Sequence, residues 1–179
     1  RLTERVWDNQ KLSIRTKANV YRSCDCSTLL YGSETWTLPS VQEKKINTFH
    51  LRCLRRILGI TWQQKITNEE VLRRTGLTTM YFTLSQRRLR WLGHILRMNT
   101  KRIPKFLLYG ELVVGKRNRG RPKLRFKDVC KRDLKSLNIG TDDWELLAND
   151  RAKWRSTIHK RLQEREKEYF RKTKKKMKK

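Results

Sequence analysis

Residues 40–59 read SVQEKKINTFHLRCLRRILG, and this stretch decides the fold. Its first four residues have the capping-box pattern, and Gly59 follows the last apolar residue, as is typical of a helix end. Between these signals, apolar residues recur at steps of three or four, which predicts a helix with one buried side and one basic side. The apolar positions are Ile46, Phe49, His50, Cys53, Leu54, Ile57 and Leu58, and the basic positions are Lys44, Lys45, Arg52, Arg55 and Arg56.

The same signals predict further helices on both sides of this stretch. They cover residues 13–30, 67–76, 78–97, 126–139 and 141–162, the last one beginning at Thr141-Asp142-Asp143. Trp residues at helical spacing in these segments are expected to be structural. The predicted fold class is therefore all-α, a small helical bundle with a long basic loop and a disordered Lys-rich C-terminal tail.

Composition divides the chain into four parts. Residues 1–98 form a helical domain, and residues 99–125 form a basic loop or linker that Pro104, Gly110, Gly115, Gly120 and Pro122 interrupt. Within this linker, residues 106–109 are predicted to form either a turn of helix or a short strand. Residues 126–168 form a C-terminal helical segment, and residues 169–179 form the disordered basic tail.

Charge limits the function more strongly than any motif does. The 179 residues include 45 Lys or Arg and 17 Asp or Glu, which gives a formal net charge of +28. Residues 97–135 alone carry 14 basic and 3 acidic residues, a balance of +11. Because so much unbalanced charge repels itself in a compact fold, we expect a polyanionic partner, with nucleic acid as the first candidate. The alternative is that the lysines only keep the chain in solution.

The segment Arg119-Gly120-Arg121-Pro122-Lys123 resembles the core of an AT-hook. Gly lets the backbone approach a groove floor, Pro keeps the chain extended, and the arginines reach along a narrow minor groove. Its alternative role is a basic turn that leads into the next helix. With the two helical Arg clusters, it gives the predicted nucleic-acid-binding residues: Arg55, Arg56, Arg87, Arg88, Arg90, Lys116, Arg117, Arg119, Gly120, Arg121, Pro122 and Lys123.

Catalytic and metal-binding patterns are weak in this sequence. Cys24-x-Cys26 and His50-x-x-Cys53 have poor zinc spacing, because two residues on one helix separated by one other point about 200° apart. The acidic pair Asp142-Asp143 lies at an expected helix start, where it serves as a cap. We expect no catalytic residue, no metal ion and no cofactor in this chain.

Location and completeness are also expectations. No apolar run is long enough for a membrane span, no signal peptide opens the sequence, and four Cys are too few for a disulfide framework. We therefore expect a nuclear or cytoplasmic protein that is not secreted and has no membrane partner. The first residue is Arg1 and the first Met is Met80, so we expect a piece of something longer.

Four motifs in order resemble a known family: residues 29–36 (LLYGSETW), 49–60 (FHLRCLRRILGI), 86–94 (QRRLRWLGH) and 120–122 (GRP). Over about residues 1–158, the chain is similar to the C-terminal part of the endonuclease–reverse transcriptases of non-LTR retrotransposons and to the related craniofacial development protein 2-like sequences. The resemblance implies a helical thumb in residues 1–98 and a basic connector, which hold the template-primer duplex beside an upstream polymerase palm. The palm's Asp residues and the endonuclease are absent, so the implied role of this chain is non-catalytic binding of RNA–DNA hybrid, DNA or RNA.

Two alternatives remain open at this point. The source gene could encode a full-length RNA-directed DNA polymerase with endonuclease, whose active sites lie upstream of this chain. The chain could also be a domesticated or decayed retroelement product that acts as a general DNA- or chromatin-binding protein. The oligomeric state is left open.

Overall fold

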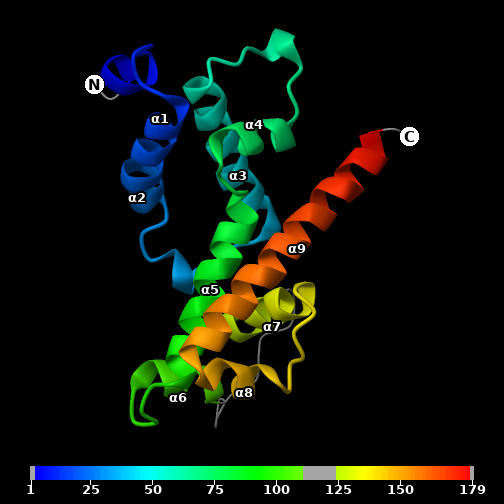
Figure 1. Cartoon of the computed structure of the whole chain (residues 1–179). Coiled ribbons are helices and arrows are strands. Elements are labelled where there is room, and N and C mark those ends of the chain that lie inside the picture. Colours follow the sequence, from blue (N-terminus) through cyan, green and yellow to red (C-terminus); the bar gives the residue numbers. More distant parts are fainter. Residues whose placement is uncertain (1–2, 111–123, 178–179) are drawn as a thin grey trace. The chain divides into compact units, whose positions relative to one another are not determined.

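The chain folds into helices in a computed structural model that describes residues 3–110 and 124–177 (Figure 1). No strand occurs in these two ranges, so the predicted all-α class is confirmed. The chain divides into two compact units: unit 1 is Arg1–Gly32 with Ser40–Thr83, and unit 2 is Ser33–Pro39 with Leu84–Lys179. The boundary after Thr83 falls inside helix α5 (Met80–Leu96), whereas the sequence predicts a boundary at 98/99.

In unit 1, short helices precede and follow one long helix along the chain. Its elements are η1 (Thr3–Trp7), α1 (Ile14–Tyr21), η2 (Arg22–Cys26), α2 (Ser27–Leu29), α3 (Ser40–Ile57), η4 (Trp62–Gln64) and α4 (Asn68–Thr75). The caps predicted at Ser13 and Thr67 are confirmed, because Ser13 Oγ accepts from Thr16 N at 3.1 Å and Thr67 Oγ1 accepts from Glu70 N at 3.4 Å. The cap predicted at Asp142-Asp143 is wrong, because Asp143 precedes the helix that begins at Trp144 without a side-chain hydrogen bond to it. Gly76 ends α4 with a φ of +66°, a conformation that glycine adopts without strain. The caps therefore fix where these helices start and stop.

The buried face of α3 is rotated from the predicted one. Phe49 is 47% exposed, although the apolar pattern assigns it to the core. Asn47 takes a buried position instead, where its Oδ1 accepts from Met80 N at 3.0 Å and caps the start of α5. The buried positions are Glu43, Asn47, His50, Leu51, Leu54 and Ile57. Because a polar residue has a tertiary partner here, α3 buries a stripe that hydrophobicity alone does not predict.

Unit 2 packs its helices around two tryptophans. Its elements are η3 (Ser33–Thr35), most of α5, α6 (Ile103–Tyr109), α7 (Phe126–Ser136), α8 (Trp144–Asn149) and α9 (Arg151–Met177). Trp154 is 1% exposed, and its Nε1 donates to Leu89 O at 3.0 Å. A Cβ added at Gly93 would lie 2.6 Å from Trp154 Cδ1, so glycine lets the indole lie against α5. The expectation that Trp144 and Trp154 are structural is confirmed, since their ring centroids lie 6.4 Å apart in this core.

The C-terminal part corrects two predictions. The single helix expected over residues 141–162 is two helices, because the chain leaves helical geometry at Asp150. There Asp150 Oδ1 accepts from Ala152 N at 2.8 Å and from Lys153 N at 3.0 Å, and so caps α9. The predicted disordered tail is wrong for residues 169–177, where α9 continues. Glu168 pairs with both Arg165 and Lys172 at 2.7 Å, so one carboxylate offsets part of the positive charge where this last stretch of the helix begins.

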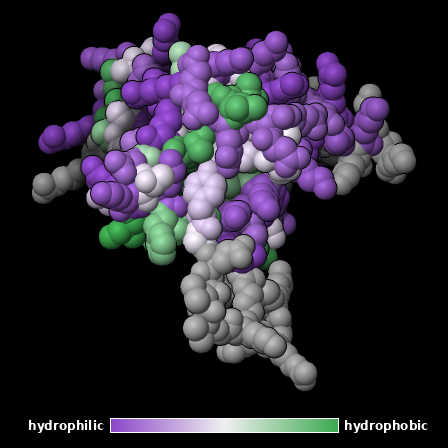
Figure 2. All heavy atoms as spheres, turned by 90° about the horizontal axis from the view of Figure 1, so that it is seen from below, coloured by the Kyte–Doolittle hydropathy of each residue, from purple (hydrophilic) through white to green (hydrophobic). Residues whose placement is uncertain are grey.

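The predicted basic loop is partly helical. Residues 106–109, expected as a helical turn or a strand, lie in α6, and residues 111–123 lie outside the described part of the chain. Hydrophilic side chains cover most of the face seen from below, with hydrophobic side chains in small groups among them (Figure 2). Within the described residues, no helix is both long and apolar enough to cross a membrane.

Candidate nucleic-acid interface

The C-terminal end of α3 forms the base of the candidate site. Beyond Ile57, Gly59 has a φ of +64°, and Ile60 N donates to Arg55 O at 2.9 Å. This six-to-one hydrogen bond is the Schellman closure of a helix, and it brings the next residue back against the last turn. Ile60 therefore lies beside the arginines of α3, and the chain then continues through η4 to α4.

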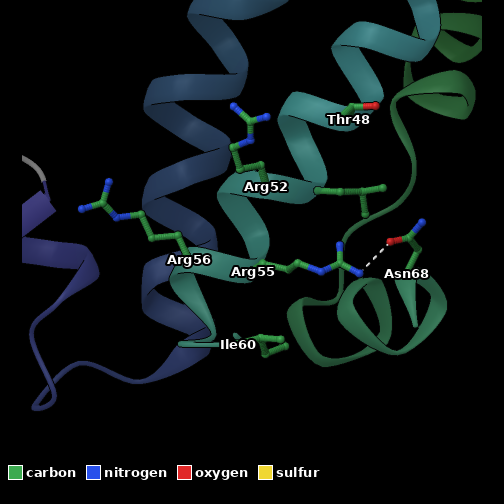
Figure 3. A pocket seen from close by; sticks show the side chains of 7 residues that line it. Thr48, Arg52, Arg55, Arg56, Ile60 and Asn68 are labelled. Atoms are coloured by element: carbon green, nitrogen blue, oxygen red, sulfur yellow. Dashed lines mark hydrogen bonds between the residues drawn. The ribbon is translucent and has the colours of Figure 1, made fainter. Parts of the chain in front are cut away.

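A pocket of about 510 Å³ lies at this end of α3 (Figure 3). Its lining residues are Thr48, Leu51, Arg52, Arg55, Arg56, Ile60 and Asn68. Positions 52, 55 and 56 fall within an arc of about 100° on a helix, and from there their side chains spread in different directions (Figure 3). No acidic residue is among the described residues that line the pocket, so its charge is positive.

Arg55 connects α3 to the segment that follows it. It is half-buried, and its Nη2 donates to Ile66 O at 3.0 Å and to Asn68 Oδ1 at 2.8 Å (Figure 3). Both acceptors are neutral, so these bonds position the guanidinium without cancelling its charge. Arg55 therefore has a structural role and still contributes positive potential to the pocket.

Arg52 and Arg56 are the exposed arginines of the pocket, and neither forms an ion pair with any residue in 3–110 or 124–177. They are four positions apart, which corresponds to a rise of about 6 Å along the helix. Arginine presents several N–H groups in a planar fork that matches phosphate oxygens. This pair therefore has the charge, the exposure and the geometry to bind neighbouring phosphates on one strand.

The α5 arginines correct the predicted site. Arg88 is 2% exposed, and its Nε donates to Asp133 Oδ2 of α7 at 2.7 Å. The prediction that Arg88 lies on an exposed basic face is wrong, because it occupies the buried stripe with Leu84 and Leu92. A guanidinium in the core requires a charged partner, and Asp133 provides it.

The other two arginines predicted on α5, Arg87 and Arg90, remain on the surface of unit 2. Arg87 Nη1 lies 3.7 Å from Glu34 Oε2, so a carboxylate partly balances its charge. Arg90 is exposed, and it forms no ion pair with any of the described residues. Of the basic face predicted on α5, Arg90 is therefore the position that keeps an exposed and unbalanced charge.

The AT-hook-like residues are not placed by the structure. Lys116, Arg117, Arg119, Gly120, Arg121, Pro122 and Lys123 all lie outside the described residues. Just after them, Arg125 Nε donates to Asp128 Oδ2 at 2.9 Å at the start of α7. Their proposed contact with a minor groove stays a prediction.

His50, one of the residues that invite a zinc interpretation, has other partners. His50 Nε2 lies 3.1 Å from Thr78 O, and its Nδ1 lies 3.0 Å from the Tyr21 hydroxyl. Since a carbonyl only accepts, Nε2 carries the proton and Tyr21 donates to Nδ1. Burial lowers the pKa of His50 to about 4 and raises the pKa of Tyr21, so both are neutral at pH 7. In the described part of the chain, no group of three or more His, Cys, Asp or Glu could hold a metal ion.

Sequence reasoning missed two contributors to the pocket. Arg52 is recognised on the basic face of residues 40–59 but is absent from the predicted binding set, although its spacing of four from Arg56 is a usable signal. Asn68 carries no such signal, because it enters only through its hydrogen bond with Arg55.

Comparison with known proteins identifies one relative. Residues of this chain are 25% identical over 155 positions to an uncharacterized transposon-derived protein of Caenorhabditis elegans. The match covers 82% of this chain, and the chain spans about half (55%) of that relative. No protein-family profile matches the chain, and no solved structure matches it. The similarity indicates a transposon-related origin. This agrees with the origin that the resemblance to retrotransposon proteins implies.

Proposed function

We propose that this chain binds nucleic acid and that Arg52, Arg55 and Arg56 contact its phosphates. The observation that carries the proposal is the α3 pocket, which three arginines and no acidic residue among the described residues line. The net charge of +28 makes a polyanion the natural partner. Nucleic acid supplies a regular row of phosphates that suits arginines one helical turn apart.

The finer proposal is that the chain serves a retroelement reverse transcriptase as its thumb and basic connector. Two motifs that carry the resemblance coincide with structured elements, since residues 49–60 span the end of α3 and residues 86–94 lie in α5. The transposon-derived relative supports the same origin. In this proposal the chain holds template-primer, and catalysis belongs to a polymerase palm elsewhere in the parent protein.

A salt-titrated binding comparison tests this function. The purified chain is titrated against an RNA–DNA hybrid, an A·T-rich duplex, a G·C-rich duplex and heparin, each at several salt concentrations. Preference for the hybrid that persists at moderate salt supports the thumb role. Preference for A·T-rich DNA supports the AT-hook-like segment instead.

Equal affinity for all four polyanions would contradict the proposal. In that case the net charge alone would account for binding, because heparin has no bases and no duplex geometry. The salt dependence has to be measured for each partner, since phosphate contacts lower log K in proportion to log salt concentration.

A further inference from the structure

Trp62 is an exposed aromatic side chain on the turn that follows the α3 pocket along the chain. It is 84% exposed, whereas Trp144 and Trp154 are buried and the other three tryptophans of the chain are partly buried. Trp62 lies two residues after Ile60, which lines the pocket. A large aromatic ring is thus exposed to solvent two residues along the chain from a residue that shares the pocket with three arginines.

The turn that carries Trp62 is ordered by hydrogen bonds. Lys65 N donates to Trp62 O at 3.2 Å, and Gln64 N donates to Thr61 O at 3.3 Å. Lys65 has a φ of +48°, a left-handed conformation that is uncommon for a residue other than glycine. Arg55 ties the end of this turn to α3 through its bond to Ile66 O. The exposure of Trp62 is therefore a property of a closed, anchored turn.

We infer that Trp62 stacks on an unpaired base of a nucleic acid whose phosphates are held by the arginines of the pocket. This inference rests on the proposed function and adds that the bound nucleic acid offers an unpaired base, as a template strand does beyond the end of its primer. Bases in a duplex are already paired and stacked, so their faces are not available to an indole ring. An unpaired base offers its whole face, and arginine next to an aromatic ring is the usual combination in single-strand binding.

The energetic expectation follows from stacking. Alanine substitution of a stacking aromatic residue lowers single-strand affinity by about 5- to 150-fold. The salt slope stays unchanged, because Trp62 carries no charge and releases no counterions. Affinity for a blunt duplex stays close to that of the unmodified chain.

The test measures binding of the full chain to one oligonucleotide as a single strand and as its blunt duplex. The variants are Trp62→Ala, Trp62→Phe and Tyr31→Ala, the last being a control because Tyr31 is 86% exposed and does not line the pocket. Trp62→Ala should weaken single-strand binding selectively, Trp62→Phe should retain most of it, and Tyr31→Ala should change neither affinity. Binding to a strand that contains 2-aminopurine should quench its fluorescence less with Trp62→Ala.

The outcomes separate this inference from the function on which it rests. If the unmodified chain binds neither form, both the proposed function and the inference are overturned. If it binds but Trp62→Ala leaves single-strand affinity intact, or weakens both forms equally, the stacking role alone is wrong. Thermal unfolding of each variant checks the fold, which an exposed side chain should affect little.

Discussion

At the scale of single residues, the partner of an arginine decides its role. Arg88 is buried and paired with the carboxylate of Asp133, so its charge is neutralised inside unit 2. Arg55 bonds to the neutral oxygens of Ile66 and Asn68, so its charge remains available to the pocket. Both residues look alike in the sequence, where each belongs to a run of basic residues on a helix.

The Arg88–Asp133 pair gives the first prediction. Arg88→Ala should lower the free energy of unfolding by about 3–5 kcal/mol, because it leaves the buried Asp133 with only the longer ion pair to Arg132, at 4.0 Å. Urea denaturation measures the loss, and Arg90→Ala on the same helix is an exposed control expected to change it by less than about 0.5 kcal/mol. Replacing both partners by leucine should recover much of the loss. A variant Arg88→Ala as stable as the unmodified chain would contradict this assignment.

The buried His50 gives a prediction for the pH dependence of stability. Its pKa is about 4 in the folded chain and about 6.5 in the unfolded chain, so the unfolded state binds the proton more readily. Its contribution is complete above pH 6.5 and is lost as the pH falls toward 4, by up to about 3 kcal/mol. His50→Gln should flatten the stability profile between pH 6.5 and 5. An unchanged slope in that variant would show that other groups cause the dependence.

At the scale of elements, the ends of helices are predictable, whereas their buried faces are less so. Ser13, Thr67 and Gly76 mark helix ends through local hydrogen bonds and backbone conformation, which the sequence encodes directly. The face of α3 depends on Asn47, which caps α5 from a distant position along the chain. A local pattern of apolar residues contains no information on such a tertiary partner.

The break between α8 and α9 has a similar cause. Trp144, Ala148, Trp154 and Ile158 are all buried, so the apolar pattern continues across the break and predicts one helix. Asp150 interrupts it because its carboxylate satisfies free backbone N–H groups at the start of α9. An acidic residue inside a helical pattern is usually exposed, so its capping role was not evident.

The Asp150 cap gives a prediction at this scale. Asp150→Ala should destabilise unit 2 by about 1 kcal/mol, because two backbone N–H groups of α9 lose their acceptor. Asp150→Asn keeps a side-chain oxygen and should retain most of the stability. Urea unfolding compares the variants. Equal stability of the alanine and asparagine variants would argue against a cap.

At the scale of the whole molecule, the charge is evident from the sequence and the site is not. The net charge of +28 predicts a polyanionic partner without any structure. The pocket in unit 1 depends on the closure of α3 at Gly59 and on Asn68 of α4, which tertiary contacts bring together. Of the residues predicted from the sequence, Arg55 and Arg56 line this pocket and Arg88 is buried, whereas Arg52 lines the pocket and was not in the predicted set.

The central claim is that the α3 pocket, and not the net charge alone, binds phosphates. Its most direct test measures the salt dependence of nucleic-acid binding for three proteins. They are the unmodified chain, the double variant Arg52→Ala/Arg56→Ala and the double variant Arg151→Ala/Arg155→Ala. The control pair is also exposed, four residues apart and free of ion pairs with described residues, and lies on α9.

Loss of Arg52 and Arg56 should reduce the slope of log K against log salt on duplex by about 1.8, or about 0.9 per phosphate contact. The control pair should change the slope much less, and neither pair should change the thermal stability greatly. Equal reductions for the two pairs would contradict the account, because binding would then follow total charge and not the pocket.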